Sequence, residues 1–364
     1  MTNAVILVGG GGTRLRPLTY AVPKPLIPVI NRPLISHLIG NLQRHGVRRI
    51  VLAAAAAERR LEAKLKDGSD LGVTLTYSYE TVPLGSGLAV KQAARGLDGP
   101  FFVCNGDVIT DLDLSAMATR HLEQEATLSI SLSAVDDPSA YGVAELGQAD
   151  RITRFVEKPS RAEAPSSWAN AGTWIFEPEV VEHIPDERMD GSLERLVFPS
   201  LIADGFTVQG FPSRAYWMDV GTSDRYMQLH RDILSGRLSG WLPDSITTEP
   251  LLGQDCQVWP DAGLETPLIL GRGCRIGALA QIGGPSVLGD RCSVRERAVI
   301  ERSLLWSDVR VGAGAVVRDS IIGDGCWIGD DAVVEGAVLA NGAKVKRAVK
   351  LSRGARLEPE EVAG

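Results

Sequence analysis

The sequence predicts an α/β domain with a mixed, mainly parallel sheet, followed by a left-handed parallel β-helix. Three observations carry this prediction. Strand-like and helix-like segments alternate from residue 1 to about 232, aliphatic residues recur at every sixth position after about 250, and turn-forming residues lie between these regions. The length of 364 residues agrees with two domains, since one domain per about 100–200 residues is usual.

The first region alternates short apolar runs with amphipathic segments. The expected strands are 4–8, 48–55, 74–80 and the start of 101–107, and the expected helices are 32–46, 57–68, 87–96 and 114–125. Such alternation predicts βαβ units with right-handed crossovers. Ligands bind at the carboxyl ends of such strands. The glycine run at 9–12 and the Asn-Gly-Asp turn at 105–107 both follow expected strands, so we expect both at that edge.

The second region has a period of six residues that no helix or ordinary sheet maintains. Nineteen positions on this period, with three five-residue steps, run from Leu252 to Leu357, and all are Leu, Ile or Val. Three hexads form one coil, and strands about 4.8 Å apart would stack roughly six coils into a prism about 30 Å tall. A second inward column of small residues contains Cys256, Cys274, Cys292 and Cys326. We interpret these cysteines as small core residues; the alternative is a metal or redox site.

Between the two regions, residues 233–245 (ILSGRLSGWLPDS) carry Gly, Ser and Pro at turn spacing. Such clusters are typical of linkers. We therefore place the α/β domain at 1–232, the linker at 233–250 and the β-helix domain at 251–364.

The composition excludes several classes of protein. The formal net charge is −7 and aromatic residues make up 5% of the chain, so neither the basic footprint nor the stacking platform of a nucleic-acid binder is present. The five cysteines form no C-x-x-C pair, which argues against a zinc cluster. No apolar run approaches the roughly 18 residues of a membrane span, and the N-terminus lacks a signal peptide. We therefore expect a cytoplasmic protein that binds neither nucleic acid nor membrane.

The glycine-rich segment VGGGGTRLRPLT at 8–19 matches neither common phosphate-binding motif. A Walker A loop needs Gly-Lys followed by Ser or Thr, and the dinucleotide fingerprint needs a glycine where Arg14 or Leu15 stands. The backbone N–H groups of the glycines, with Arg14, Arg16 and Lys24 downstream, still supply the parts of a polyphosphate cradle. The alternative is a flexible turn.

Further motifs follow in order along the chain. They are LGSG (84–87), FFVCNGDVITD (101–111), YGVAEL (141–146), FVEKP (155–159), NAGTWIF (170–176) and YWMDVGTSDRY (216–226). Together with GGGGTRLRPLTYAVPKPLIPV (9–29), they resemble the sugar-nucleotide pyrophosphorylases, which join a nucleoside triphosphate to a sugar 1-phosphate. The hexapeptide β-helix is the usual appendage of that family, so the resemblance covers nearly the whole chain. It implies a Rossmann-like nucleotidyltransferase domain, and the similarity to guanylyltransferase members favours GTP and mannose 1-phosphate as substrates.

The resemblance also implies the functions of individual residues. Mg²⁺ is the implied cofactor, held by Asp107 and Asp219, with Asp111 as a weaker rival for the first position. The implied catalytic residues are Arg14, Lys24, Asp107 and Asp219. The implied nucleotide-binding residues are Leu7, Gly9, Gly10, Gly11, Gly12, Thr13, Arg14, Lys24, Gly85, Gly87 and Asp107. The residues implied for the sugar phosphate are Tyr141, Gly142, Glu157, Lys158, Asn170 and Gly172.

The implied reaction needs no general base. A sugar phosphate whose second pKa is about 6 is already ionised at pH 7, so alignment and charge neutralisation suffice. Arg14 and Lys24 would neutralise the triphosphate, and Lys158 would clamp the sugar phosphate. The five histidines fall outside the motifs, and we expect them to be structural or exposed; they are His37, His45, His121, His183 and His230.

Some features depart from the family pattern and leave alternatives open. LGSG is one residue shorter than the usual LGTAG loop, and the preceding segment lacks the Gln typical of thymidylyl- and uridylyl-transferring relatives. A purine is therefore favoured, with glucose-1-phosphate thymidylyl- or uridylyltransferase as the alternative. A non-catalytic regulatory homologue would lack the cations or carboxylates retained here, and a hexapeptide acyltransferase needs a His base that residues 231–364 do not contain. We expect a homo-oligomer, with the β-helix as a candidate interface.

Overall fold

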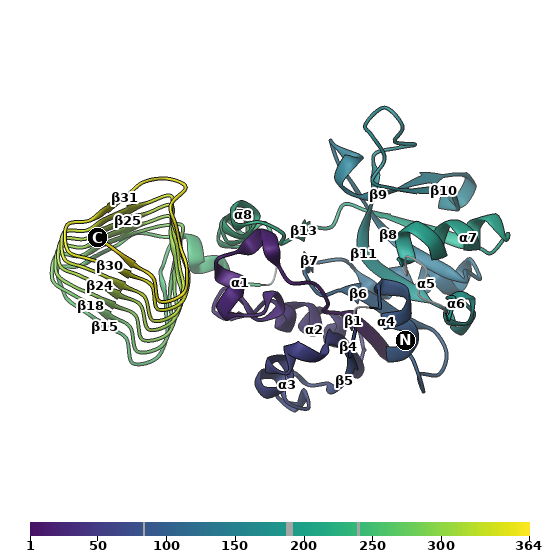
Figure 1. Cartoon of the computed structure of the whole chain (residues 1–364), viewed down its shortest axis with the longest axis horizontal. Coiled ribbons are helices and arrows are strands. Elements are labelled where there is room, and N and C mark those ends of the chain that lie inside the picture. The colour runs from purple at the N-terminus through teal and green to yellow at the C-terminus, as the bar shows by residue number, and fades with distance from the viewer. Residues whose placement is uncertain (83, 187–191, 239–240) are drawn as a thin grey trace. The chain divides into compact units, whose positions relative to one another are not determined.

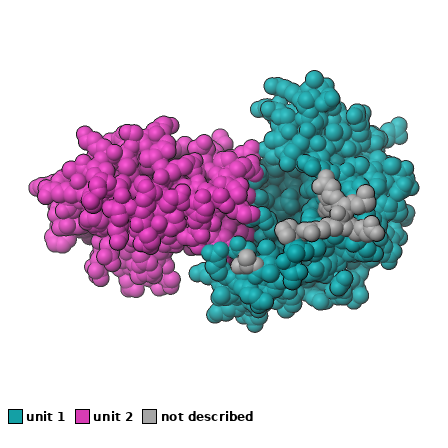
Figure 2. Space-filling model, viewed as in Figure 1, with its two compact units in different colours: residues 1–10, 35–219 teal, residues 11–34, 220–364 magenta. Residues whose placement is uncertain are grey.

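The computed structural model describes residues 1–82, 84–186, 192–238 and 241–364. Backbone contacts divide the chain into two compact units, Met1–Gly10 with Ile35–Asp219 and Gly11–Leu34 with Val220–Gly364 (Figure 2). The segment 11–34 and the end of the expected α/β domain therefore group with the β-helix. The division into an α/β domain at 1–232, a linker at 233–250 and a β-helix domain at 251–364 was based on changes in the sequence pattern, and it stays a prediction.

A nine-stranded mixed sheet forms the centre of the first unit (Figure 1). Its main path has the order β10-β9-β11-β6-β1-β4-β5, and β8 pairs with both β11 and β12. The strands are β1 Asn3–Leu7, β4 Arg49–Ala55, β5 Thr74–Glu80, β6 Phe101–Asn105, β8 Leu128–Ala134, β9 Gly142–Leu146, β10 Ile152–Glu157, β11 Trp168–Phe176 and β12 Val208–Ser213. Strands β6, β1, β4 and β5 are parallel, whereas β11 runs antiparallel to β6, β8 and β9. The predicted mixed α/β fold is confirmed.

Helices connect the parallel strands as the sequence predicts. The helices of this unit are α2 Leu34–Arg44, α3 Arg60–Leu65, α4 Ser86–Ala93, α5 Leu114–Glu123, α6 Pro178–His183 and α7 Phe198–Ala203. Helix α2 joins β1 to β4, α3 joins β4 to β5, and α4 joins β5 to β6. These three βαβ units bring the carboxyl ends of β1, β4, β5 and β6 to one edge of the sheet.

Residues 251–364 form the predicted parallel β-helix, with one sheet along each of its three faces (Figure 1). The first sheet contains β14 Leu251–Leu252, β17 Leu268–Leu270, β20 Ser286–Leu288, β23 Leu304–Leu305, β26 Ile321–Ile322, β29 Val338–Leu339 and β32 Arg356–Leu357. The second contains β15 Gln257–Val258, β18 Arg275–Ile276, β21 Ser293–Val294, β24 Arg310–Val311, β27 Trp327–Ile328, β30 Lys344–Val345 and β33 Val362–Ala363. The third contains β16 Gly263–Leu264, β19 Gln281–Gly283, β22 Val299–Glu301, β25 Val316–Arg318, β28 Val333–Glu335 and β31 Lys350–Leu351. The aliphatic residues of the six-residue period form its core, except for Leu252 on the first coil, which is exposed.

The cysteine column lies inside this core. Cys274, Cys292 and Cys326 are fully buried, and all five cysteines of the chain are free thiols. Each of these three thiols donates a hydrogen bond to a backbone carbonyl of the next coil, at 3.0–3.1 Å. The hydrogen bond with Cys274 and burial raise the pKa of Cys292, and the same hydrogen bond lowers the pKa of Cys274. Burial raises the pKa of Cys326 to about 12. These three cysteines belong to the apolar core of the β-helix, and Cys256 packs against that core, which confirms the interpretation as small core residues.

We expect Cys274→Ala to change stability only slightly. The substitution removes one small sulfur atom and one thiol–carbonyl hydrogen bond, so the free energy of unfolding should fall by about 1 kcal/mol. Denaturant unfolding and an activity assay check this. A large loss of activity or of bound metal would contradict the assignment to the core.

The outward face of the first sheet is also buried. Its outward residues are 8% exposed or less on five successive coils, at Ile269, Val287, Leu304, Ile321 and Val338. Sheets buried on both faces carry continuous apolar strands, which fits the paired aliphatic residues of this sheet.

Helix α8 (Ser223–Leu234) and the segment Gly11–Leu34 form hydrogen bonds with residues of this sheet or next to it, and with each other. Trp306 Nε1 donates to Tyr226 Oη at 3.1 Å, and Tyr226 Oη donates to the Pro28 carbonyl. Asn31 Nδ2 donates to the Leu288 carbonyl at 2.9 Å, and His230 Nε2 accepts from Ile30 N at 3.2 Å. His230 is thus structural, as predicted. The segment contains α1 Leu18–Ala21, β2 Pro28–Val29 and β3 Arg32–Pro33.

Candidate active site

The turn after β6 places Asp107 beside the end of β1. Gly106 N donates to the Leu7 carbonyl at 2.9 Å. A Cβ at Gly106 would lie 2.8 Å from Leu7 O and 2.8 Å from Val8 Cγ1, so this close approach requires glycine. Because β1 and β6 are parallel neighbours, the structure brings Asp107 to the start of the glycine run.

A two-stranded antiparallel ribbon of β7 (Val108–Thr110) and β13 (Trp217–Asp219) aligns the predicted metal carboxylates. Asp219 pairs with Val108, so Asp219 and Asp107 lie at the same end of the ribbon. Near the other end, Asp111 Oδ1 accepts a hydrogen bond from Tyr216 N at 2.7 Å. This bond gives Asp111 a structural function at the start of β13.

The carboxylates at this end of the ribbon could hold a divalent cation such as Mg²⁺. That ion prefers one or two carboxylates and completes its octahedron with phosphate oxygens and water. Over the described residues, no group of three or more His, Cys, Asp or Glu side chains could hold a metal ion alone. Asp107 and Asp219 supply two carboxylates at one end of the ribbon, a ligand set that a divalent cation can share with a bound triphosphate.

The glycine run extends from the first unit into the second, and each part is described by itself. Gly9 and Gly10 belong to the first unit and are exposed, and a Cβ built on either would meet no atom within 4 Å. This stretch therefore offers accessible backbone N–H groups, which is what a phosphate cradle requires.

In the second unit, Gly12 turns the chain towards the predicted phosphate cations. Its φ of 55° is left-handed, and its carbonyl accepts from Leu15 N at 2.9 Å and from Thr19 Oγ1 at 2.8 Å. A Cβ on Gly12 would lie 3.2 Å from Lys24 Cβ, so Lys24 starts beside the turn. Arg14 is exposed on the short helix Thr13–Leu15.

The LGSG motif forms the start of α4. Gly85 adopts a left-handed φ of 82° before the helix, and Gly87 is buried in its first turn. Ser86 Oγ accepts from Leu193 N at 2.9 Å and donates to Glu194 Oε2 at 3.4 Å. These two hydrogen bonds connect the motif to the π-helical turn Leu193–Val197.

Tyr141, Gly142, Glu157 and Lys158 lie on the hairpin of β9 and β10. Gly142 pairs with Glu157, and a Cβ on Gly142 would lie 2.8 Å from Glu157 Oε2. Lys158 Nζ lies 3.5 Å from Glu157 Oε1. The Tyr141 ring meets the Trp217 ring edge-on, with centroids 5.1 Å apart. The hairpin thus presents a carboxylate, an ammonium and an aromatic ring close together.

Glu157 lies in an unusual electrostatic environment. Burial raises its pKa, the nearby Glu194 carboxylate raises it further, and the Lys158 ammonium opposes both. Raised carboxylate pKa values are common at functional sites. Glu194 therefore connects the LGSG motif to the hairpin residue predicted to contact the sugar.

Asn170 and Gly172 form an irregular turn in β11. Asn170 Oδ1 accepts from Gly172 N at 3.0 Å and from Trp174 Nε1 at 2.9 Å. Gly172 has a φ of 73°, and a Cβ there would lie 2.8 Å from Asn105 Nδ2. Asn170 thus shapes the strand with its carbonyl oxygen, and Gly172 lets β11 approach the Asn105-Gly106-Asp107 turn.

Most of the predicted site residues therefore lie on the first unit. They are Leu7, Gly9, Gly10, Gly85, Gly87, Asp107, Tyr141, Gly142, Glu157, Lys158, Asn170, Gly172 and Asp219, while Gly11, Gly12, Thr13, Arg14 and Lys24 belong to the second unit. Sequence reasoning missed Gly106, Ser86, Glu194 and Trp217 as site residues. Gly106, Ser86 and Trp217 stand inside the quoted motifs, whereas nothing in the sequence singled out Glu194.

A family model described as "Nucleotidyl transferase" matches residues 3–236, which include every residue of this site. The chain belongs to the nucleotidyl transferase family. A second model, described as "EIF2B subunit epsilon LbH domain", matches residues 249–351 and fits the predicted left-handed β-helix. The resemblance drawn from the motifs is thereby confirmed.

Curated relatives give the family a narrower context. "Mannose-1-phosphate guanylyltransferase" of Mycobacterium tuberculosis is 36% identical over 64% of this chain and 65% of its own length. "Probable mannose-1-phosphate guanylyltransferase 1" of Oryza sativa subsp. japonica is 36% identical over 71% of this chain and 75% of its own. "UTP--glucose-1-phosphate uridylyltransferase" of Synechocystis is 32% identical over 88% of this chain and 87% of its own. The chain thus spans just under two thirds of the mycobacterial relative.

Two solved structures share the fold over nearly two thirds of the chain. A putative glucose-1-phosphate thymidylyltransferase from Bacillus anthracis, solved with a sucrose, has a TM-score of 0.57 at 24% identity and covers 63% of this chain and 94% of its own. HddC from Yersinia pseudotuberculosis has a TM-score of 0.55 at 27% identity and covers 64% of this chain and 100% of its own. Separately, none of the helices in the described ranges has the length and apolarity needed to span a bilayer.

Proposed function

We propose that the chain transfers GMP from GTP to mannose 1-phosphate, giving GDP-mannose and pyrophosphate. The observation that carries the proposal is the ribbon of β7 and β13, which aligns Asp107 and Asp219 at one end, with Asp107 beside the start of the glycine run. The names of the guanylyltransferase relatives support the choice of substrates.

The residues of the site suit a reaction that needs positioning rather than proton transfer. An oxygen of mannose 1-phosphate attacks the α-phosphorus of GTP, a P–O bond forms, and the bond to the β-phosphate oxygen breaks to release pyrophosphate. The attacking phosphate is already ionised near neutral pH. Arg14, Lys24 and the exposed glycine backbone would neutralise and hold the triphosphate, and alignment of the two phosphates supplies much of the rate. Asp107 and Asp219 would hold Mg²⁺, which adds charge neutralisation when bound.

The hairpin of β9 and β10 would bind the second substrate. Lys158 would attract the phosphate of mannose 1-phosphate, and the Glu157 carboxylate would accept hydrogen bonds from sugar hydroxyls. Tyr141 and Trp217, in edge-on contact, would close the apolar side of the sugar. Gly142 leaves the space for Glu157 to face the ligand.

The pKa of Glu157 predicts a pH dependence. Only the ionised carboxylate accepts hydrogen bonds fully, so the KM for mannose 1-phosphate should rise as pH falls through the raised pKa of Glu157. Glu194→Gln removes the neighbouring negative charge and lowers that pKa, so the same rise should occur at a lower pH. Glu179→Gln, on α6, should leave the profile in place. A Glu194→Gln profile unchanged, or moved to higher pH, would show that Glu194 does not act on Glu157.

The substrate pair is tested by a matrix of the five common nucleoside triphosphates against the 1-phosphates of mannose, glucose and N-acetylglucosamine. We expect the fastest pyrophosphate release from GTP with mannose 1-phosphate. The second candidate is uridylyl transfer to glucose 1-phosphate, favoured by the Synechocystis relative, which aligns with 88% of this chain. Fastest release with UTP and glucose 1-phosphate would select it.

Two further properties accompany this proposal. The homo-oligomer, with the β-helix as its interface, and the cytoplasmic location stay predictions. Equilibrium sedimentation of the purified chain tests the first.

A further inference from the structure

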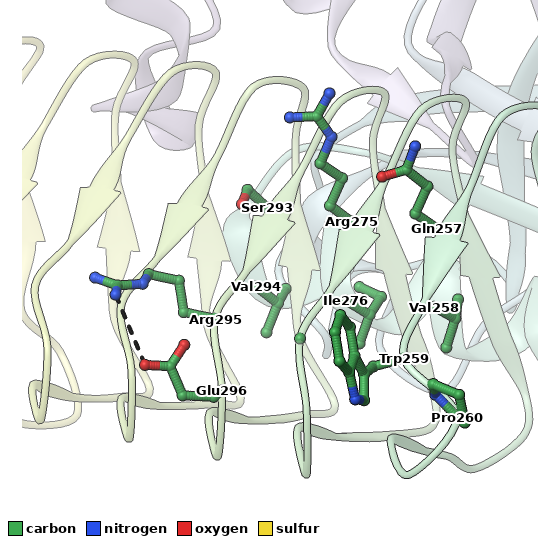
Figure 3. A pocket seen from close by; sticks show the side chains of 11 residues that line it. Gln257, Val258, Trp259, Pro260, Arg275, Ile276, Ser293, Val294, Arg295 and Glu296 are labelled. Atoms are coloured by element: carbon green, nitrogen blue, oxygen red, sulfur yellow. Dashed lines mark ion pairs between the residues drawn. The ribbon is translucent and has the colours of Figure 1, made fainter.

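The second sheet of the β-helix carries a groove at its first three coils (Figure 3). Its volume is about 650 Å³, within the roughly 300–1,000 Å³ typical of small-molecule sites. Strands β15, β18 and β21 form its floor. None of the residues predicted for catalysis or substrate binding lines it.

The groove has an aromatic wall that the fold does not need. Trp259 follows β15 and is 59% exposed, so its ring contributes little to the core. The equivalent position after β18 is Gly277, and after β21 it is Arg295. Because Gly277 has no side chain, space is left along the coils between Trp259 and Arg295.

The charges around the groove favour an anion. Arg295 Nη2 lies 3.6 Å from Glu296 Oε1, and Arg295 Nη1 lies 3.3 Å from Asp330 Oδ1, so two carboxylates compensate the charge of Arg295. Arg275 is exposed and forms no ion pair with any residue in the described ranges. Figure 3 shows Trp259 and Arg275 on neighbouring coils and Arg295 directed towards Glu296. The groove is thus lined by an exposed indole and, on the next coil, by a guanidinium without a described ion-pair partner, which is directed away from the indole ring.

We propose that this groove is a second nucleotide site, in which a nucleobase stacks on Trp259 and a phosphate binds Arg275. Exposed aromatic rings bind any nucleobase by stacking, and a guanidinium suits phosphate because its planar fork matches two phosphate oxygens. Both the nucleoside triphosphate substrate and the nucleotide-sugar product carry these groups. The site lies on the β-helix and is distinct from the proposed active site.

The test is the number of nucleotides bound per chain, measured by calorimetry with GTP and, separately, with GDP-mannose. We expect two equivalents for the wild type and one for Trp259→Ala, with the second site weakened roughly tenfold or more in Arg275→Gln. Trp327→Ala and Arg310→Gln are matched controls, because both residues are exposed on the same sheet outside the groove, and both should keep two equivalents. The arm with the tighter second site identifies which nucleotide the groove prefers.

Three outcomes would overturn the proposal. The first is a wild type that binds one nucleotide per chain and a Trp259→Ala variant that still binds it. The second is an equal loss of nucleotide binding in Trp259→Ala and in Trp327→Ala. The third is a Trp259→Ala variant that changes only its oligomeric state, which would make the groove a contact between copies of the chain. If only the proposed active site does not bind nucleotide, the result differs. The wild type would then bind one nucleotide per chain, and Trp259→Ala would bind none. Thermal unfolding of each variant checks that the exposed substitutions leave the fold intact.

Discussion

Asp107→Asn should lower the rate of GDP-mannose formation by about 10²–10³-fold or more, a range typical of losing one charge-stabilising group. The substitution keeps the size of the side chain but removes the negative charge that a divalent cation requires. The midpoint of thermal unfolding should stay close to that of the wild type, because the effect is local to the ribbon end. Steady-state pyrophosphate release at saturating Mg²⁺ measures the loss.

Asp111→Asn is the matched control for this substitution. Asp111 accepts a hydrogen bond from Tyr216 N, and the amide oxygen of Asn can accept the same bond. Activity should therefore stay near that of the wild type. Near-normal turnover in Asp107→Asn, with a large loss of turnover in Asp111→Asn, would show that Asp111 rather than Asp107 is the metal ligand.

Gly106→Ala should both destabilise the first unit and impair catalysis. The added Cβ would lie 2.8 Å from the Leu7 carbonyl oxygen, a backbone atom that cannot move without disturbing the junction of β1 and β6. We expect a loss of about 1–3 kcal/mol in the free energy of unfolding. Since misplacing a catalytic group by about 1 Å can cost roughly a hundredfold in rate, turnover should fall more than the loss of folded protein explains.

Gly40→Ala provides the comparison for a glycine that no contact requires. Gly40 lies within α2, and a Cβ there would meet no atom within 4 Å. Alanine favours a helix more than glycine does, so stability should stay equal or rise by up to about 1 kcal/mol. If Gly106→Ala and Gly40→Ala had the same effect on stability and on turnover, the close approach at Gly106 would not be what positions Asp107.

Sequence reasoning succeeded where one local pattern determines the structure. The six-residue period placed the core of the β-helix, and the fully buried Cys274 and Cys292 followed from the same count. The signal for the buried outward face was also present: pairs such as Ile269-Leu270 and Val338-Leu339 put aliphatic residues on both faces of one strand. What covers that face depends on tertiary contacts, so the grouping of Gly11–Leu34 and α8 with the β-helix could not be predicted.

The site shows the same division. The position of Asp107 after an expected strand predicted that it would lie at the carboxyl edge of the sheet, whereas Asp219 was implied only by the family resemblance. The pairing of Asp219 with Val108 joins residues 111 positions apart in the chain, and no periodicity reports such a contact. Glu194 lies outside the motifs, and only the structure shows that its carboxylate is near enough to Glu157 to raise the pKa of that residue.

The central claim is that this chain joins GTP to mannose 1-phosphate at the site containing Asp107 and Asp219. The most direct measurement is the amount of GDP-mannose and of pyrophosphate formed by the purified chain with Mg²⁺, and again after chelation of the metal. We predict that both products form in equal amounts and that both stop on chelation and resume when Mg²⁺ is restored. No nucleotide sugar from these substrates, or equal formation with the metal removed, would contradict it.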